Sequence, residues 1–388
     1  MSVTLIVNRC QELFDDLDFT ASRQWKAAAP GRKVIGFLPT YVPREIIHAA
    51  GMLPLGVLGG GENMEVIHGD AYYQSYICRI PRSTIELGVS GKLDFVDGML
   101  FPFVCDVIRN LSGIWKLMFP NVMSKFFDPP QNYNPEIGGK YYAYELSQLL
   151  ASLEKLSGRK VSDDDLRKSI RVYNENREVT REVYDFRAKF PWKALSSEVY
   201  LLMRAGMVLP PEEHTQLMRD YMAAAEKEDR PIRDNCRVVV TGSFCEQPPL
   251  NLIKSIEMSG CYIVDDDYML VNRWIMGDIK EEGNPIENIA LAFLNQSWET
   301  ACKYQPDEDK KGEYLVECVK ARGAEGIIFA APSFCDPALL ERPMLQKRVA
   351  AANIPYTAFK YAENSGQMQP IREQAGTFAD SIKLWSEQ

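Results

Sequence analysis

The sequence has only three histidines, no cysteine pair of the CxxC type and no long apolar run. So few histidines leave little supply for zinc sites that combine cysteine with histidine. No stretch approaches the roughly 20 apolar residues of a membrane span, and the amino terminus lacks the basic and long apolar regions of a signal peptide. We therefore expect a cytoplasmic protein with no membrane partner.

An excess of basic residues is also missing. The chain carries 44 Lys and Arg against 53 Asp and Glu, for a net charge of -9. Nucleic-acid surfaces need clustered positive charge, so we expect no nucleic-acid partner. The G-x-x-x-x-G-K-[ST] pattern of a phosphate loop is absent as well, so ATP is not expected to bind here. The triplet Gly59–Gly61 lacks the G-x-G-x-x-G arrangement and predicts only a flexible turn.

What is present is an ordinary globular composition, with 46% apolar and 25% charged residues in 388. That length exceeds what one hydrophobic core usually serves. Strand-like runs alternate with helix-like runs, first in RKVIGFLPT, VPREIIHAAGM, LPLGVLG, FVDGMLFP and DVIRNLSGIWKLM. The same order begins again in CRVVVTGS, PPLNLIKSIEMSG, CYIVDDD and GIIFAA. This alternation predicts an α/β fold with two doubly wound, flavodoxin-like domains, each with a parallel sheet.

Between the two copies the apolar residues recur three and four positions apart, which indicates helices. Ser162 and Asp165 have the spacing of a capping box and predict a helix start. We therefore expect an amino-terminal helix over residues 1–30, a first α/β domain over 31–137, a helical domain over 138–234 and a second α/β domain over 235–388.

Cysteines follow the strands of both predicted domains. Cys105 comes after FVDGMLFP, and Cys335 comes after GIIFAA, where Asp336 is expected to cap a helix and Pro337 to begin it. Cys78 stands before another helix-like run. Ligands of doubly wound sheets lie beyond the carboxyl ends of the strands, and a helix amino terminus favours a thiolate. Three such thiols suit a cubane iron-sulfur cluster with one open iron, but from spacing alone a zinc site or plain packing cysteines stay open.

Four stretches of the chain carry a family resemblance: VPREIIHAAGMLPLGV, GDAYYQSYICRIPRSTIELG, DFVDGMLFPFVCDVIRNL and FCDP. They resemble the 2-hydroxyacyl-CoA dehydratase and benzoyl-CoA reductase family over most of the chain, least in the helical insert. Residues 68–111 are most similar to the smaller cluster-bearing subunit of the reductase branch. The resemblance implies a 4Fe-4S cluster on Cys78, Cys105 and Cys335.

The resemblance also implies an activity and an assembly. The implied reaction is reduction of an aromatic acyl-CoA to a cyclic dienoyl-CoA in anaerobic aromatic degradation. The implied partners are a larger homologous cluster-bearing subunit and two ATP-hydrolysing subunits in a heterotetramer fed by ferredoxin. Two alternatives stay open: a subunit of a 2-hydroxyacyl-CoA dehydratase, and a non-catalytic subunit whose metal organises a partner.

Further candidates lie near the cysteine loops. Ring reduction needs a proton donor. Our candidates are His68 and Tyr73, with Tyr72 and Tyr76 nearby. Candidate binding residues for CoA or another anion are Arg82 in the Cys78 segment, with Arg79 beside it, and Gly366 at the start of a predicted helix. Cys245, after the first strand of the second domain, is a possible further iron ligand.

Overall fold

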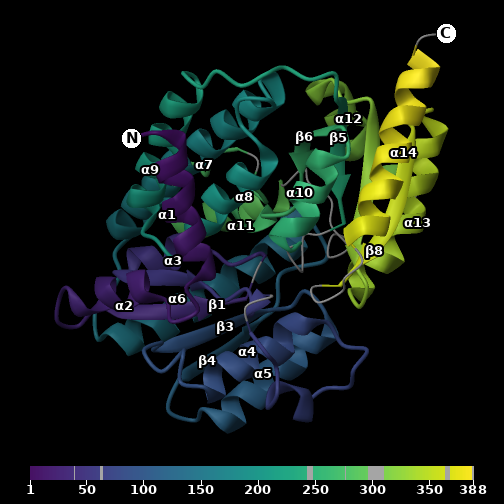
Figure 1. The fold of residues 1–388 in the computed structure, drawn as a ribbon. Helices are drawn as coiled ribbons and strands as arrows, with labels where there is room; N and C mark the ends of the chain where they lie inside the picture. Colours follow the sequence, from purple (N-terminus) through teal and green to yellow (C-terminus); the bar gives the residue numbers. More distant parts are fainter. Residues whose placement is uncertain are drawn as a thin grey trace.

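A computed structural model of the chain describes residues 1–38, 40–61, 64–242, 248–275, 277–295, 310–362 and 368–386. Within these ranges lie two four-stranded sheets in which every pairing is parallel. Figure 1 shows the first sheet in the lower part of the molecule and the second beside helices α13 and α14. The predicted pair of doubly wound α/β domains is therefore confirmed as a fold class.

The first sheet has the strand order β2-β1-β3-β4. Its strands are β1 (Lys33–Phe37), β2 (Met52–Gly56), β3 (Gly98–Pro102) and β4 (Met123–Phe127). The accompanying helices are α2 (Thr20–Ala27), α3 (Arg44–Ala49), α4 (Arg79–Val89) and α5 (Asp106–Met118). Strand β4 is missing from the sequence-based description, because MSKFF is short and only its last residue is fully buried.

The second sheet repeats this plan with the order β6-β5-β7-β8. Its strands are β5 (Cys236–Thr241), β6 (Cys261–Asp266), β7 (Gly326–Pro332) and β8 (Tyr356–Tyr361). Its helices are α10 (Leu250–Met258), α12 (Glu313–Arg322), α13 (Asp336–Ala351) and α14 (Met368–Ser386). Successive side chains of β5 belong to different core clusters: Val238 and Val240 share one with α10 and α14, and Val239 shares another with α12 and α13. Helices therefore cover both faces, as a parallel sheet requires.

The remaining helices pack against one another and against elements of both sheets. They are α1 (Val3–Asp15), α6 (Lys140–Ser157), α7 (Asp163–Lys189), α8 (Ser196–Ala205), α9 (Pro211–Ala225) and α11 (Pro285–Leu294). Short helical turns are η2 (Gly69–Ala71), η3 (Pro135–Gly139) and η4 (Leu270–Asn272). The predicted capping box is confirmed, since Ser162 Oγ accepts from the Asp165 amide and the Asp165 carboxylate accepts from the Ser162 amide.

Helix α7 is the longest connection between the two sheets. Near its middle, Arg177 forms a buried ion pair with Glu45 of α3. Near its end, Arg187 Nη1 donates to Asp266 Oδ2 of β6 over 2.6 Å, and both side chains are about 2% exposed or less. One rigid helix thus fixes the first sheet relative to the second. No helix in the described ranges is both long and apolar enough to cross a membrane.

Candidate functional site

Each of the three candidate thiols directly precedes a helix. Cys78 is the N-cap of α4, Cys105 of α5 and Cys335 of α13. The expectation for α13 is wrong by one residue, because Asp336 already has helical geometry and Cys335 takes the capping position. Cys335 is 5% exposed, whereas the other two are half-buried. All three thiols therefore lie at a helix start, where the first-turn amides lack intrahelical acceptors.

The expectation of a lowered thiol pKa is wrong for Cys105. Burial raises its pKa above the usual value, and the Cys335 and Asp106 side chains raise it further. The first-turn amides of Val107 and Ile108 act in the opposite direction, but they do not outweigh the loss of solvation. The effect of Cys335 on the Cys105 pKa is consistent with these two thiols, which follow strands of different sheets, lying near each other.

Tyr73 lies near two of the cysteines, Cys78 and Cys105. Burial raises the pKa of its phenol, and Cys78 and Cys105 raise it further. Its hydroxyl is buried and has no hydrogen-bond partner within the described ranges. An unpaired buried hydroxyl is costly, so Tyr73 is a candidate to face a ligand beside the two thiols. By contrast, Tyr72 and Tyr76 are 48% and 63% exposed.

The structure links two of the three cysteines to each other and Tyr73 to two of them. Interactions link Cys105 with Cys335, and Tyr73 with both Cys78 and Cys105. Over the described part of the chain, no three His, Cys, Asp or Glu side chains are gathered closely enough to hold a metal ion. The donor type therefore fits an iron-sulfur cluster, although the side chains as positioned do not form a closed metal site.

His68 is held on the surface by a buried acid that the sequence reasoning missed. Its Nδ1 lies 2.9 Å from Glu86 Oε1, and its ring is 61% exposed. The other Glu86 oxygen accepts from the amides of Ile67, His68 and Gly69 at 2.6 to 3.0 Å. Burial works against ionisation of Glu86, yet these hydrogen bonds outweigh it and lower its pKa. Glu86 thus fixes the loop that leads to Tyr73. In the sequence, the feature that could have revealed this role is an acidic residue among the apolar residues of a predicted helix.

Of the predicted anion-binding residues, the structure describes Arg79 and Arg82. Arg82 Nη1 donates to Asp70 Oδ1 at 2.8 Å, and its buried Nε has no partner among the described residues. Arg79 donates to the carbonyl of Met64. Cys245 and Gly366 lie outside the described residues.

A second feature missed from the sequence follows β1. Thr40 and Tyr41 have φ values of 76° and 59°, and both are fully buried. A β-branched residue in the left-handed region is strained, and such strain gathers at functional sites. The strained segment Thr40–Tyr41 lies at the same sheet edge as Cys105, because β1 and β3 are neighbouring strands. No residue preference in the sequence could indicate it.

These features define a two-domain α/β protein with thiols from both sheets at the strand ends. Comparison with protein families gives the class: residues 39–382 match the family described as 2-hydroxyglutaryl-CoA dehydratase, D-component. The chain belongs to this family. The resemblance expected from the cysteine segments is therefore confirmed.

Relatives within the family are similar over nearly the whole chain. Over 386 residues, covering 100% of both proteins, the chain is 66% identical to a benzoyl-CoA reductase subunit of Thauera aromatica. It is 30% identical to the (R)-phenyllactyl-CoA dehydratase beta subunit of Clostridium sporogenes, covering 91% of this chain and 92% of that one. It is 29% identical to the beta subunit of (R)-2-hydroxyglutaryl-CoA dehydratase of Acidaminococcus fermentans, covering 92% and 94%.

Proposed function

We propose that this chain is the smaller cluster-bearing subunit of an ATP-dependent benzoyl-CoA reductase. The observation that carries the proposal is 66% identity over full length to a subunit of such an enzyme, against 30% and 29% to dehydratase subunits. In the proposed reaction the ring of benzoyl-CoA gains two electrons and two protons and becomes a cyclic dienoyl-CoA. The electrons come from ferredoxin through two ATP-hydrolysing partner subunits, and the heterotetramer also contains a larger homologous subunit.

Cys78, Cys105 and Cys335 are the proposed ligands of a 4Fe-4S cluster. A cluster bound there supplies low-potential electrons to the ring when reduced. The thiols come from helix starts in both domains, so the site closes only when the two sheets are held together. Cys245 is the candidate for an additional ligand.

Tyr73 is the better proposed proton donor of the two candidates. Its hydroxyl is buried, unpartnered within the described ranges and beside two of the proposed ligands. His68 is engaged by Glu86 and mostly exposed, so it orders the loop rather than reaching a reacting ring. A raised phenol pKa keeps Tyr73 protonated, which suits a group that gives up its proton only to a developing anion. Arg82, whose buried Nε has no partner among the described residues, and Gly366 remain candidates for binding the CoA portion.

The test is anaerobic purification of the chain with its partner subunits, followed by iron and sulfide analysis and an assay with benzoyl-CoA, ATP and a low-potential reductant. Formation of dienoyl-CoA with electrons consumed in proportion supports the proposal. Dehydration of a 2-hydroxyacyl-CoA with no net electron consumption would assign the chain to the dehydratases instead. A complex that holds metal but performs neither reaction would make the chain a scaffold subunit.

A further inference from the structure

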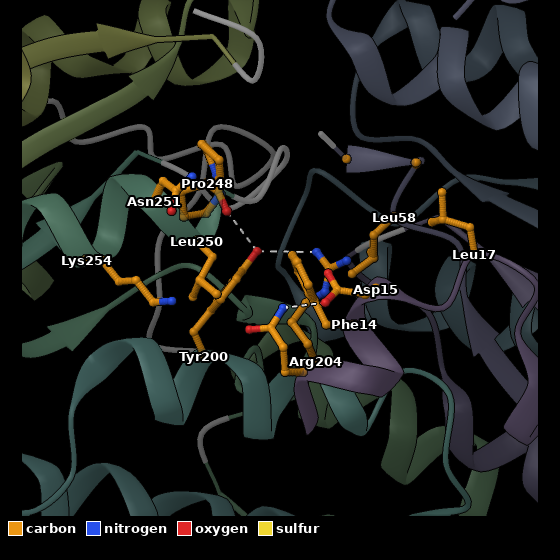
Figure 2. Close-up of a pocket in the computed structure, with 15 residues that line it drawn as sticks. Phe14, Asp15, Leu17, Leu58, Tyr200, Arg204, Pro248, Leu250, Asn251 and Lys254 are labelled. Atoms are coloured by element: carbon orange, nitrogen blue, oxygen red, sulfur yellow. Dashed lines mark hydrogen bonds between the residues drawn. The ribbon is translucent and has the colours of Figure 1, made fainter. Parts of the chain in front are cut away.

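A pocket of about 220 Å³ lies where α1, the turn after β2, α8 and the start of α10 meet, and none of its described lining residues is a cysteine. Figure 2 shows Lys254 and Asn251 on one side of it and Phe14 and Leu58 on the other. The turn follows a strand of the first sheet, and α10 follows a strand of the second. The pocket therefore lies beyond the carboxyl ends of strands from both domains, where doubly wound folds bind ligands.

Two cations line this pocket, and neither forms an ion pair with a described residue. The guanidinium carbon of Arg204 lies 4.8 Å from the centre of the Phe14 ring, and its Nη1 donates to Tyr200 Oη at 3.3 Å. The ring contact holds the guanidinium plane in place and leaves other N–H groups available. Asp15, the one acid among the described lining residues, accepts from Gln11 Nε2 at 2.9 Å. Among these described residues positive charge thus exceeds negative, although the chain as a whole is acidic.

The start of α10 adds backbone donors to the same wall. Its N-cap is Pro249, which offers no side-chain cap. The amides of Leu250 and Asn251 have no intrahelical acceptor and no other partner within the described residues, whereas the Leu252 amide bonds to the Pro249 carbonyl. Lys254 follows one turn later. A helix start with free amides and a lysine beside it suits an anion, and here an arginine across a formed pocket points to the same ligand.

The glycine triplet shapes the opposite wall. Gly59 has a φ of +78°, and a Cβ at this position would lie 2.5 Å from Ser83 Oγ. A Cβ on Gly60 would lie 2.6 Å from the Met64 side chain. Glycine is therefore required for the turn to pack against α4, and the pocket is lined there by bare backbone.

We propose that this pocket binds a phosphate group at the nucleotide end of the acyl-CoA substrate. The inference rests on the proposed function for the identity of the ligand. The volume is below the roughly 300 Å³ at which pockets begin to hold a whole drug-sized molecule, so a phosphate with part of its sugar fits and the complete CoA does not. An arginine fork, a lysine and free helix amides are the groups that recognise phosphate esters. A free nucleotide shares this chemistry, so the test separates the two sources.

The experiment measures binding of CoA, 3′-dephospho-CoA and AMP to the purified complex by calorimetry, without reductant. Lys254→Gln and Arg204→Gln are compared with Lys280→Gln, a matched change at an exposed lysine outside the pocket. Either pocket variant is expected to raise the Kd for CoA about tenfold, as for the loss of one charge-assisted contact, and Lys280→Gln to leave it unchanged. Unchanged CoA affinity in both pocket variants would overturn the proposal; if AMP affinity fell in its place, the pocket would be a free-nucleotide site.

This result is independent of the proposed reaction. A complex that fails to reduce benzoyl-CoA, yet loses CoA affinity on Lys254→Gln, would refute the reductase assignment and support the pocket. A complex that reduces the ring with the wild-type KM for benzoyl-CoA in both pocket variants would refute the pocket alone. Arg204→Lys refines the assignment, because it keeps the charge but not the two-pronged geometry and should restore only part of the affinity.

Discussion

Cys105 and Cys335 occupy equivalent positions in the two sheets. Cys105 precedes the helix that follows β3, Cys335 precedes the helix that follows β7, and β3 and β7 take the same place in their strand orders. The two thiols also interact, since Cys335 raises the pKa of Cys105. A repeated strand-cysteine-helix unit thus brings one thiol from each domain to a shared site.

Replacing either equivalent cysteine should remove the proposed cluster. We expect Cys105→Ser and Cys335→Ser to lose most of the iron and the visible absorption of the anaerobic complex, because an alcohol is a poor ligand for iron at neutral pH. Cys318→Ser is the matched control: Cys318 packs in α12 near Asp265 and Arg273, away from the candidate thiols. Iron and sulfide analysis measures the effect. Full iron content in the Cys335 variant would contradict its assignment as a ligand.

Tyr73→Phe removes one oxygen from the site. If its hydroxyl gives a proton to the ring, the rate of ring reduction should fall about 10²- to 10⁴-fold, whereas the iron content stays unchanged. The neighbouring Tyr72→Phe is the control, since that side chain is 48% exposed, and it should keep the wild-type rate. Steady-state kcat and iron content are measured on the same samples. A Tyr73 variant with the wild-type rate would eliminate this residue as the donor.

The sequence was sufficient to predict what local patterns encode. The alternation of strands and helices, the Ser162–Asp165 capping box and the thiols at helix starts all follow from short segments. Strand β4 escaped because an edge strand of five mostly half-buried residues has little apolar pattern.

The remaining features depend on packing between distant segments. The raised pKa of Cys105 results from burial, which opposes the helix-start effect that the sequence suggests. Two further features depend on how α4 packs against the loop before it. They are the burial of the Tyr73 hydroxyl and the hydrogen bonds that Glu86 accepts from three consecutive amides. Arg204 and Lys254 are 50 positions apart along the chain and meet at one pocket because α8 packs against α10.

Breaking the buried Arg187–Asp266 ion pair should destabilise the fold. Asp266→Asn would remove the hydrogen-bonded counter-charge of the Arg187 guanidinium, which is 1% exposed, so we expect a loss of about 3 to 5 kcal/mol in the free energy of unfolding. Urea unfolding of the full chain followed by tryptophan fluorescence measures it.

The matched control for that pair is Glu175→Gln. Arg219 Nη1 lies 2.8 Å from Glu175 Oε1, and both side chains are about half exposed, so breaking this pair should cost about 1 kcal/mol or less. A further variant, Arg187→Met with Asp266→Leu, should recover much of the stability by replacing the pair with apolar packing. Equal losses in the free energy of unfolding for Asp266→Asn and Glu175→Gln would show that burial does not make the Arg187–Asp266 pair contribute more to stability than an exposed pair.

His214 makes the stability of the fold depend on pH. Burial lowers its pKa from 6.5 to about 4, and its ring is held neutral between the Leu202 carbonyl, 3.0 Å from Nε2, and Asn176 Nδ2, 3.1 Å from Nδ1. Because the unfolded chain takes up this proton more readily, the contribution is complete above the unfolded pKa and is lost as the pH falls toward the folded value. Between about pH 7.5 and about pH 5 it should amount to about 2 kcal/mol. Urea unfolding of the wild type and of His214→Gln at both pH values isolates the contribution of His214. The variant should be less stable at the higher pH and should lose about 2 kcal/mol less stability on acidification. Equal losses of stability in the two proteins would mean that His214 is not the titrating group.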